Sequence, residues 1–369
     1  MNIQIAFFGS SLVSAYWNGA ATYYRGILSA LHERGYGITF YEPDAFERQQ
    51  HRDIPDPQYA RSVVYSADQA GVEKALAEAQ DADIIVKASG VGVFDELLEA
   101  AVLEFRRPDC RVVFWDVDAP ATLDRVGSDP KDPFGPLIPE YDLILTYGGG
   151  PPVVNGYEGL GARRCIPVYN ALDPSTHHPV EPDPRFTAAL GFLGNRMPDR
   201  EGRVAEFFFG PAAECPDLQF LLGGNGWGEH APELANVDYL GHVYTRDHNA
   251  FNVTPTAVLN ISRESMARYG FSPATRVFEA AGAGACLITD AWEGIEQFLT
   301  PGSECLVARN GAEVVRHLRE LTQERSRSIG RAGRNRMLKE HTYRHRAEAL
   351  DRIFQGLFAS GSAKERAAS

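Results

Sequence analysis

Residues 271–290 read FSPATRVFEAAGAGACLITD, which is typical of an amphipathic helix followed by a glycine hinge and a buried strand. Ser272 is a good N-cap, Pro273 suits the first helical position, and Thr275 adds a hydroxyl in the first turn. The free N–H groups and the dipole of such a helix start favour an anion. This stretch therefore predicts a helix that binds a phosphate group at its N-terminus.

Two charged side chains follow on the same helix. Glu279 lies three residues after Arg276 and four after Thr275, so the three side chains share one side of the helix. A carboxylate only accepts hydrogen bonds, and one that lies just behind a phosphate site is suited to binding both hydroxyls of a ribose diol. The alternative is an ordinary capped helix with an Arg–Glu surface pair.

Apolar strands alternate with helical patterns along both halves of the chain. This alternation indicates an α/β protein with two parallel sheets, each covered on both faces by helices. In the first half, strands are expected at residues 3–8, 37–43, 81–88, 111–116 and 142–150. In the second half, they are expected at residues 188–194, 218–224, 237–243, 257–262, 285–290 and 304–308.

The alternation stops at residues 167–186, which contain five prolines and no sustained periodicity. This interruption indicates a boundary between two domains, and a length of 369 residues suits two. The expected division is an N-terminal Rossmann-like domain, a linker, a C-terminal ligand-binding domain, a helix that returns to the N-terminal domain, and a disordered tail. Their expected bounds are residues 1–170, 171–186, 187–345, 346–358 and 359–369, respectively.

Composition limits the function. The chain has 36 Lys and Arg against 49 Asp and Glu, a net charge of −13, which argues against nucleic acid as a partner. No apolar run is long enough to span a bilayer, and the N-terminus does not resemble a signal peptide. Five scattered cysteines form neither a zinc motif nor a disulfide framework, so we expect a cytoplasmic protein. Residues 325–346 carry eight Lys or Arg against one acidic residue, which allows at most peripheral membrane contact.

Polar residues and glycines follow several strands of the second half. Because ligands bind at the carboxyl ends of parallel strands, we expect these residues to meet at one site. The candidates are Gly194, Asn195, Arg196, Gly224, Gly241, Asn260 and Arg263, together with Ser272, Thr275, Arg276 and Glu279.

The segment NISRESMARYGFSPATRVFEAAGAGACLITDAWEG, with PGSECLVARNGAEVVRHLREL and KEHTYRHRAE, resembles the nucleotide-sugar-binding half of CgeB-like glycosyltransferases. The segments NGAATYYRGILSALHERGYGITFYEPD and VVFWDVDAPATLDRV resemble the N-terminal domain of this family. The resemblance covers nearly the whole chain. It implies the GT-B fold, in which two Rossmann-like domains face each other across a cleft.

The resemblance also implies a reaction. The C-terminal half would bind a nucleoside-diphosphate sugar, for which we favour a UDP-sugar, with Glu279 on the ribose. Many retaining relatives carry a second glutamate where this chain has Phe271, and relatives have a histidine at the position of Ala20. We therefore expect an inverting, metal-independent hexosyl transfer, without a cofactor, to an unidentified glycan, protein or small molecule. The alternatives are a nucleotide-sugar epimerase and a non-catalytic protein that binds sugar nucleotides or glycans.

An inverting transfer needs a general base beside the acceptor hydroxyl. In the first half, Asp116 and Asp118 follow the strand RVVFWD and are the best candidates, with Asp118 preferred. Two other interpretations remain: a metal-binding DxD pair, or a structural or acceptor-binding role. Four further residues at strand ends are candidates for contact with the acceptor: Asn18, Gly19, Lys87 and Ser89.

Overall fold

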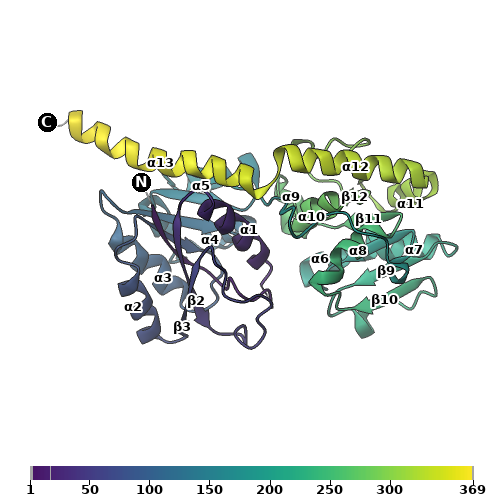
Figure 1. Ribbon diagram of the computed structural model, residues 1–369, viewed down its shortest axis with the longest axis horizontal. Helices are drawn as coiled ribbons and strands as arrows, with labels where there is room; N and C mark the ends of the chain where they lie inside the picture. The colour runs from purple at the N-terminus through teal and green to yellow at the C-terminus, as the bar shows by residue number, and fades with distance from the viewer. Residues whose placement is uncertain (1–2, 17, 368–369) are drawn as a thin grey trace. The chain divides into compact units, whose positions relative to one another are not determined.

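The computed structural model describes residues 3–16 and 18–367, and side chains as far as Ala359. The chain folds into two compact units (Figure 1). Unit 1 comprises Met1–Tyr169 and Tyr343–Ser369, and unit 2 comprises Asn170–Thr342.

Unit 1 contains a seven-stranded parallel sheet in the order β3-β2-β1-β4-β5-β6-β7. Its strands are β1 (Gln4–Phe8), β2 (Gly37–Asp44), β3 (Arg61–Ser66), β4 (Ile84–Ala88), β5 (Arg111–Asp116), β6 (Leu143–Thr146) and β7 (Cys165–Pro167). Its helices are α1 (Ala21–His32), α2 (Gln69–Glu78), α3 (Asp95–Ala101), α4 (Ala119–Ser128), α5 (Gly150–Gly159) and α13 (Tyr343–Ala367). The central strands form because their apolar residues are buried on both faces, as expected for a parallel sheet.

Aromatic side chains fill the core of unit 1. The rings of Phe7 and Phe40 stack with centroids 5.2 Å apart across β1 and β2. The indole of Trp115 donates a hydrogen bond to the hydroxyl of Tyr23, which itself donates to the carbonyl of Val168. These bonds satisfy the polar atoms of large buried rings.

Helix α13 lies alongside α1 in unit 1 (Figure 1). Gly26 of α1 allows this approach, because a β-carbon there would lie 2.1 Å from the ring of Tyr343. Further along, Asp351 accepts hydrogen bonds from the side chains of Arg34 and Tyr36. Helix α13 continues through residues 359–367 of the expected tail, where Ala, Lys, Glu and Arg are good helix formers; residues 368–369 lie outside the described residues.

Unit 2 contains a six-stranded parallel sheet in the order β10-β9-β8-β11-β12-β13. Its strands are β8 (Leu190–Leu193), β9 (Phe220–Gly223), β10 (Val237–Gly241), β11 (Ala257–Asn260), β12 (Leu287–Asp290) and β13 (Leu306–Ala308). Its helices are α6 (Pro198–Val204), α7 (Gly210–Glu214), α8 (His248–Val253), α9 (Glu264–Tyr269), α10 (Thr275–Ala283), α11 (Gly311–Glu320) and α12 (Gln323–Glu340).

Residues 171–186, which the sequence analysis interprets as a linker, belong to unit 2. Leu172 packs under α10, where a β-carbon on Gly282 would lie 2.2 Å from its side chain. His177 is 5% exposed, and Phe186 is buried against Phe251 of α8. This proline-rich stretch is therefore held against unit 2 by buried side chains.

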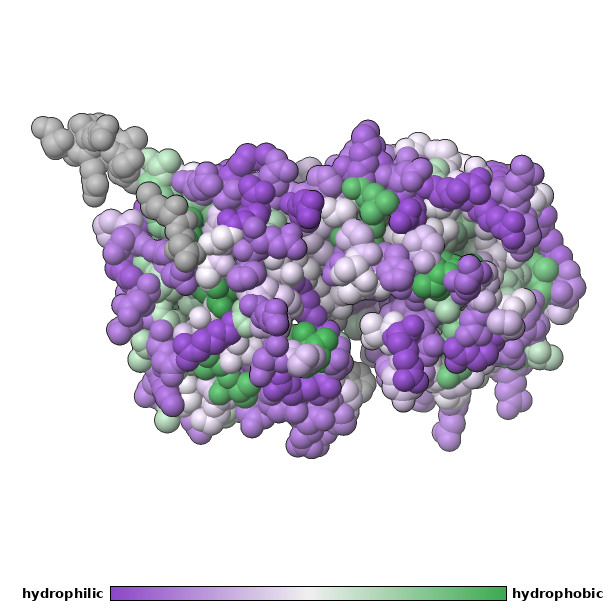
Figure 2. Space-filling view, viewed as in Figure 1, coloured by the Kyte–Doolittle hydropathy of each residue, from purple (hydrophilic) through white to green (hydrophobic). Residues whose placement is uncertain are grey.

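The surface is mainly hydrophilic on the face that Figure 2 shows, with apolar residues in small groups. Among the described residues, no helix combines the length and apolar character needed to cross a membrane.

Candidate functional site

The sheet of unit 2 has a topological switch point between β8 and β11. These two strands are neighbours, and the chain continues from them toward opposite edges of the sheet. In such sheets, ligands bind outside the carboxyl ends of the strands at the switch point. The segments that leave β8 and β11 are thus the first place to seek a ligand site.

The predicted glycine loops after β8, β9 and β10 contact one another. The backbone N–H of Gly224 donates to the carbonyl of Gly241 at 2.7 Å, and the N–H of Asn225 donates to the side chain of Asn195 at 2.9 Å. A β-carbon on Gly224 would lie 2.3 Å from the carbonyl oxygen of Gly194. The structure therefore brings together three segments that the sequence places far apart.

A group of arginines surrounds the switch point. Burial lowers the pKa of Arg200 to about 10; the nearby Asp199 opposes this shift, and the positive charges of Arg276 and Arg263 add to it. Arg263 also lies 2.5 Å from Asp199. Three arginine side chains therefore lie near one another at the switch point, and guanidinium groups are suited to binding a diphosphate. Arg200 was not among the predicted site residues, although it follows β8 closely, as Arg196 does.

Arg196 and Asn260 are predicted site residues that already have protein partners. Arg196 forms an ion pair with Glu201 at 2.8 Å on the loop after β8. Asn260 is 2% exposed, and its amide donates to the hydroxyl of Thr289. Asn260 therefore acts within the sheet, where a ligand does not reach it.

The start of α10 differs from the prediction. The helix begins at Thr275 with Ala274 at the N-cap position, so Ser272 is not the cap. The local sequence does not account for this shift, because a proline after Ser272 is compatible with Ser272 as an N-cap, whose backbone is itself non-helical. The hydroxyl of Ser272 is buried and has no hydrogen-bond partner among the described residues. Because α10 lacks a capping side chain, its first N–H groups are still suited to an anionic ligand.

Behind this helix start, Glu279 is surrounded by basic side chains. Its carboxylate lies 3.6 Å from the guanidinium of Arg276 and 3.9 Å from the imidazole of His177. Burial alone raises the pKa of Glu279, but the charges of His177 and then Arg276 outweigh it, and the pKa lies below its ordinary value. Glu279 is therefore ionised at neutral pH and accepts hydrogen bonds only.

His248 completes this environment from α8. Burial, together with the charge of Arg276, lowers the pKa of His248 to about 4, so its imidazole is neutral near pH 7. His177, His248 and Glu279 offer ligand atoms within 4.8 Å of one another. Sequence reasoning missed both histidines, because His177 lies in the proline-rich stretch and nothing local marks His248.

In unit 1, the two candidate carboxylates occupy different environments. Asp116 has no exposed surface and accepts hydrogen bonds from the hydroxyls of Ser89 and Tyr157 and from the N–H of Asp118. Burial raises the pKa of Asp116. This buried position argues against Asp116 as a catalytic base. Asp118 is half-buried and precedes α4, so it is the member of the pair that a substrate can approach.

Lys87 does not line a site, contrary to the prediction. Its side chain is fully buried, and its amine lies 2.6 Å from Asp95 and 3.8 Å from Glu99. The amine also donates to the carbonyl of Ala88. The two acidic residues occupy successive turns of α3. Burial raises the pKa of Glu99 to about 7, so the closer carboxylate of Asp95 is the main partner that allows the lysine to remain buried.

The other acceptor candidates have different surroundings. Asn18 is 8% exposed, and its side chain forms hydrogen bonds within the loop after β1. Its amide oxygen accepts from the hydroxyl of Ser10, and its amide nitrogen donates to the carbonyls of Ser11 and Ser14. Ser89 is tied to Asp116 as described above. Gly19 is exposed, and a β-carbon there would meet no atom within 4 Å. Of these three, Gly19 is therefore the most accessible.

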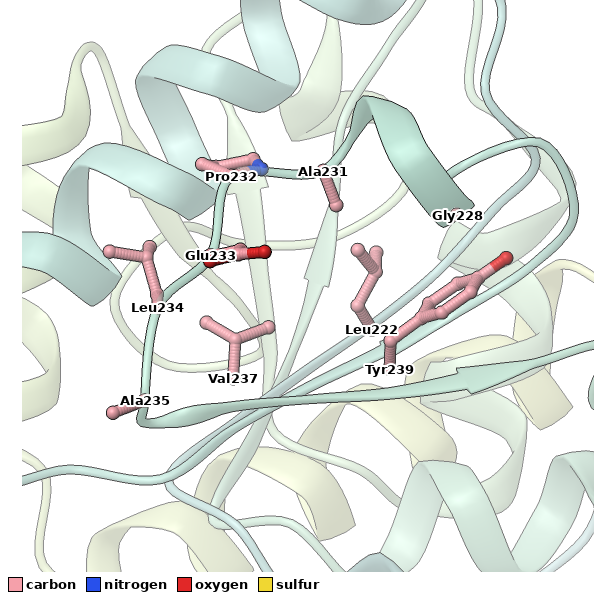
Figure 3. A pocket seen from close by; sticks show the side chains of 9 residues that line it. All are labelled: Leu222, Gly228, Ala231, Pro232, Glu233, Leu234, Ala235, Val237 and Tyr239. Carbon is pink, nitrogen blue, oxygen red and sulfur yellow. The ribbon is translucent and has the colours of Figure 1, made fainter.

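A separate groove of about 550 Å³ lies at the edge of the unit 2 sheet (Figure 3). Its lining residues are Leu222, Gly228, Ala231, Pro232, Glu233, Leu234, Ala235, Val237 and Tyr239. None of them is a predicted site residue, and the one charged side chain among them is acidic. The groove is therefore unsuited to a diphosphate, and the arginine group at the switch point is the better candidate.

Comparisons with known proteins bear on the fold and on part of unit 2. Residues 200–352 match a family model described as "Glycosyl transferase-like". No curated protein gives a significant sequence match. Among solved structures, sucrose-phosphate synthase from Thermosynechococcus elongatus has a TM-score of 0.67 and 12% identity, over 97% of this chain and 100% of that chain.

Two further structures are similar to the chain. The protein Alr3699/HepE from Anabaena, solved in complex with UDP and glucose, has a TM-score of 0.67 and 12% identity, over 96% of this chain and 100% of that chain. An alpha-glucosyltransferase, solved with UDP and a 13-mer DNA containing a HMU base, has a TM-score of 0.70 and 12% identity, over 96% and 100% of the two chains. The fold is thus of the GT-B class, and unit 2 contains most of the glycosyl transferase-like segment.

Proposed function

We propose that this protein is a CgeB-like glycosyltransferase that takes a hexose from a nucleoside-diphosphate sugar, with a UDP-sugar as the favoured donor. The observation that carries the proposal is the group formed by Arg200, Arg263 and Arg276 at the switch point of unit 2. Arg200 and Arg276 donate to the carbonyls of Asn195 and Leu193 at the end of β8, and Arg263 lies after β11, immediately before α9. The uncapped start of α10 and the ionised Glu279 lie in the same unit. Two structural neighbours solved with UDP support the choice of nucleotide.

In this proposal, each part of the donor has a partner in unit 2. The diphosphate meets the first N–H groups of α10 and the guanidinium groups of Arg263 and Arg276, and the ribose diol meets Glu279. Negative charge grows on the diphosphate as the sugar departs, so fixed positive charge stabilises the transition state more than the bound donor. We propose that this charge replaces a metal ion and that the reaction needs no resident cofactor.

The acceptor step is assigned to unit 1. We propose that Asp118 takes the proton of the acceptor hydroxyl as this oxygen attacks the anomeric carbon, with inversion. Phe271 supports inversion, because it is apolar where many retaining relatives carry a glutamate. A general base contributes about 100-fold or more to such a step.

Titration calorimetry with UDP, GDP, TDP and uridine tests the donor site, and incubation with labelled UDP-sugars tests turnover. UDP should bind most tightly. Arg263→Gln should weaken UDP binding about tenfold or more, as expected for one charge-assisted hydrogen bond, and leave uridine binding unchanged. Arg325→Gln, on the exposed surface of α12, is the matched control.

The results separate the proposal from its rivals. Slow release of free sugar and UDP indicates a transferase, and an epimerised sugar nucleotide indicates an epimerase. Binding without turnover under every condition contradicts the enzymatic proposal. If Arg263→Gln lowers the affinities for UDP and for uridine equally, the arginine group does not bind the phosphates.

A further inference from the structure

The donor site described above leaves one buried side chain without a role. His177 is 5% exposed and lies on the stretch that precedes β8. Its Nε2 atom lies 3.9 Å from Oε1 of Glu279, while the other oxygen of Glu279 faces Arg276 at 3.6 Å. A basic side chain therefore lies beside each oxygen of this carboxylate.

Neighbouring hydrogen bonds determine which way the imidazole of His177 faces. The hydroxyl of Thr176 donates to the carbonyl of Asp173 at 3.2 Å. The same hydroxyl lies 2.9 Å from Nδ1 of His177, and when it donates to this nitrogen the ring N–H is on Nε2. This arrangement leaves Nε2 directed at Glu279. The turn at Asp173 thus holds His177 in place before any ligand arrives.

The cluster could instead hold a metal ion, since His248 bonds Val243 through Nε2 and so leaves its other ring nitrogen as a ligand. Charge argues against this. Glu279 is the one carboxylate of the cluster, and the guanidinium of Arg276 already lies beside it. A divalent cation would place two more positive charges in a largely buried site without a second anion.

We propose that His177 is a positioning residue, which holds the carboxylate of Glu279 so that its two oxygens meet the 2′- and 3′-hydroxyls of a ribonucleoside diphosphate. The inference rests on the proposed function, because it assigns the ribose to Glu279. It adds that diol recognition depends on a residue that does not touch the nucleotide, located on the proline-rich stretch. Nucleotides that lack the 2′- and 3′-hydroxyls should therefore bind this site with lower affinity.

Calorimetry with UDP and 2′,3′-dideoxy-UDP tests this inference. The wild-type protein should bind UDP at least tenfold more tightly than the dideoxy compound. Both Glu279→Gln and His177→Ala should lower this ratio at least threefold, with the affinity for dideoxy-UDP unchanged. Unchanged binding of dideoxy-UDP also shows that each variant is folded.

Two more variants sharpen the test. His177→Gln keeps a side-chain donor and should retain part of the ratio, whereas a purely structural role predicts no such rescue. His178→Ala is the matched control, since His178 is exposed and its ring bonds the carbonyl of Pro179. This control should leave the ratio unchanged.

Each contrary result has its own meaning. If Glu279→Gln loses the preference for UDP over dideoxy-UDP and His177→Ala keeps this preference, the positioning role is overturned and the donor site stands. If the wild-type protein binds neither compound, the proposed function itself fails. If Zn²⁺ binds with one-to-one stoichiometry, is lost in His177→Ala, and chelation removes the diol preference, the cluster is a metal site and the positioning role is overturned.

Discussion

The carbonyl oxygen of Gly194 lies directly in front of Gly224, only 2.3 Å from where a β-carbon on residue 224 would be. Gly224 also has a φ of +122°, which side chains rarely tolerate. The loops after β8 and β9 meet at this point, so the glycine is required by the protein itself before any ligand binds.

We predict that Gly224→Ala destabilises the protein by about 1–3 kcal/mol and weakens UDP binding, because the two loops must move apart. Gly228→Ala is the control on the same loop, since a β-carbon there meets no atom within 4 Å. Urea denaturation and calorimetry measure the two effects. If Gly224→Ala and Gly228→Ala are equally stable, the loops accommodate a methyl group at residue 224 without loss of stability, and the prediction is wrong.

Lys87→Met should destabilise unit 1 without changing UDP affinity. Removing one member of a buried ion pair costs about 3–5 kcal/mol, and here Asp95 and Glu99 would lose their shared partner. Lys74→Met, at an exposed position on α2, should change stability little. A weaker affinity for UDP in Lys87→Met, at temperatures where the protein stays folded, would contradict its purely structural role.

Asp118→Asn should lower turnover about 100-fold or more while donor affinity stays the same, because asparagine cannot accept the proton. Asp116→Asn is the informative comparison, because Asp116 is buried and its substitution should mainly lower the stability of the protein. Steady-state kinetics and calorimetry on both variants measure the difference. Near-normal turnover in both would place the base elsewhere.

The low pKa of His248 predicts a pH dependence of stability. Its folded value is about 4 and its ordinary value is 6.5, so the unfolded chain binds more protons between these pH values. The free energy of unfolding should therefore fall as the pH falls from 6.5 toward 4, by at most about 1.4 kcal/mol per pH unit for this group. His248→Gln should flatten this part of the profile, whereas His178→Gln should leave it unchanged.

We predict that activity persists in EDTA, because the arginine group and the start of α10 supply the positive charge that a metal ion would otherwise provide. Turnover of a UDP-sugar with and without chelator measures this. Complete loss of turnover that manganese restores would favour the metal-binding interpretation of Asp116 and Asp118.

Much of the fold is predictable from the sequence. The apolar runs of β1, β4, β5 and β8 are distinct because these strands are buried on both faces. Two edge strands escaped prediction. In β3 most side chains are partly or fully exposed, so its residues RSVVYS lack a continuous apolar run, and β7 has three residues only. Edge strands lose half of the burial that makes central strands recognisable.

The site is less predictable, since its pairings depend on segments far apart in the chain. The burial of Lys87 has a local signal: Asp95 and Glu99 are spaced by one helical turn on the next helix. The contact of His177 with Glu279 has no such signal, because about a hundred residues separate the two. Nor does a local signal reveal that α10 starts at Thr275, because Ser272 and Pro273 are the residue types expected at an N-cap and at a first helical position.

The discontinuity of unit 1 has a consequence for synthesis of the protein. Unit 2 is a single stretch whose ends meet, since Leu172 donates a backbone hydrogen bond to His341 at 2.8 Å and pairs with Thr342. Helix α13 belongs to unit 1 and leaves the ribosome after all of unit 2. During translation, unit 2 is therefore complete before Tyr343 is available to cover the face of α1 around Gly26. A chain that stops before Tyr343 would keep unit 2 whole and leave that face of α1 open to chaperones or aggregation.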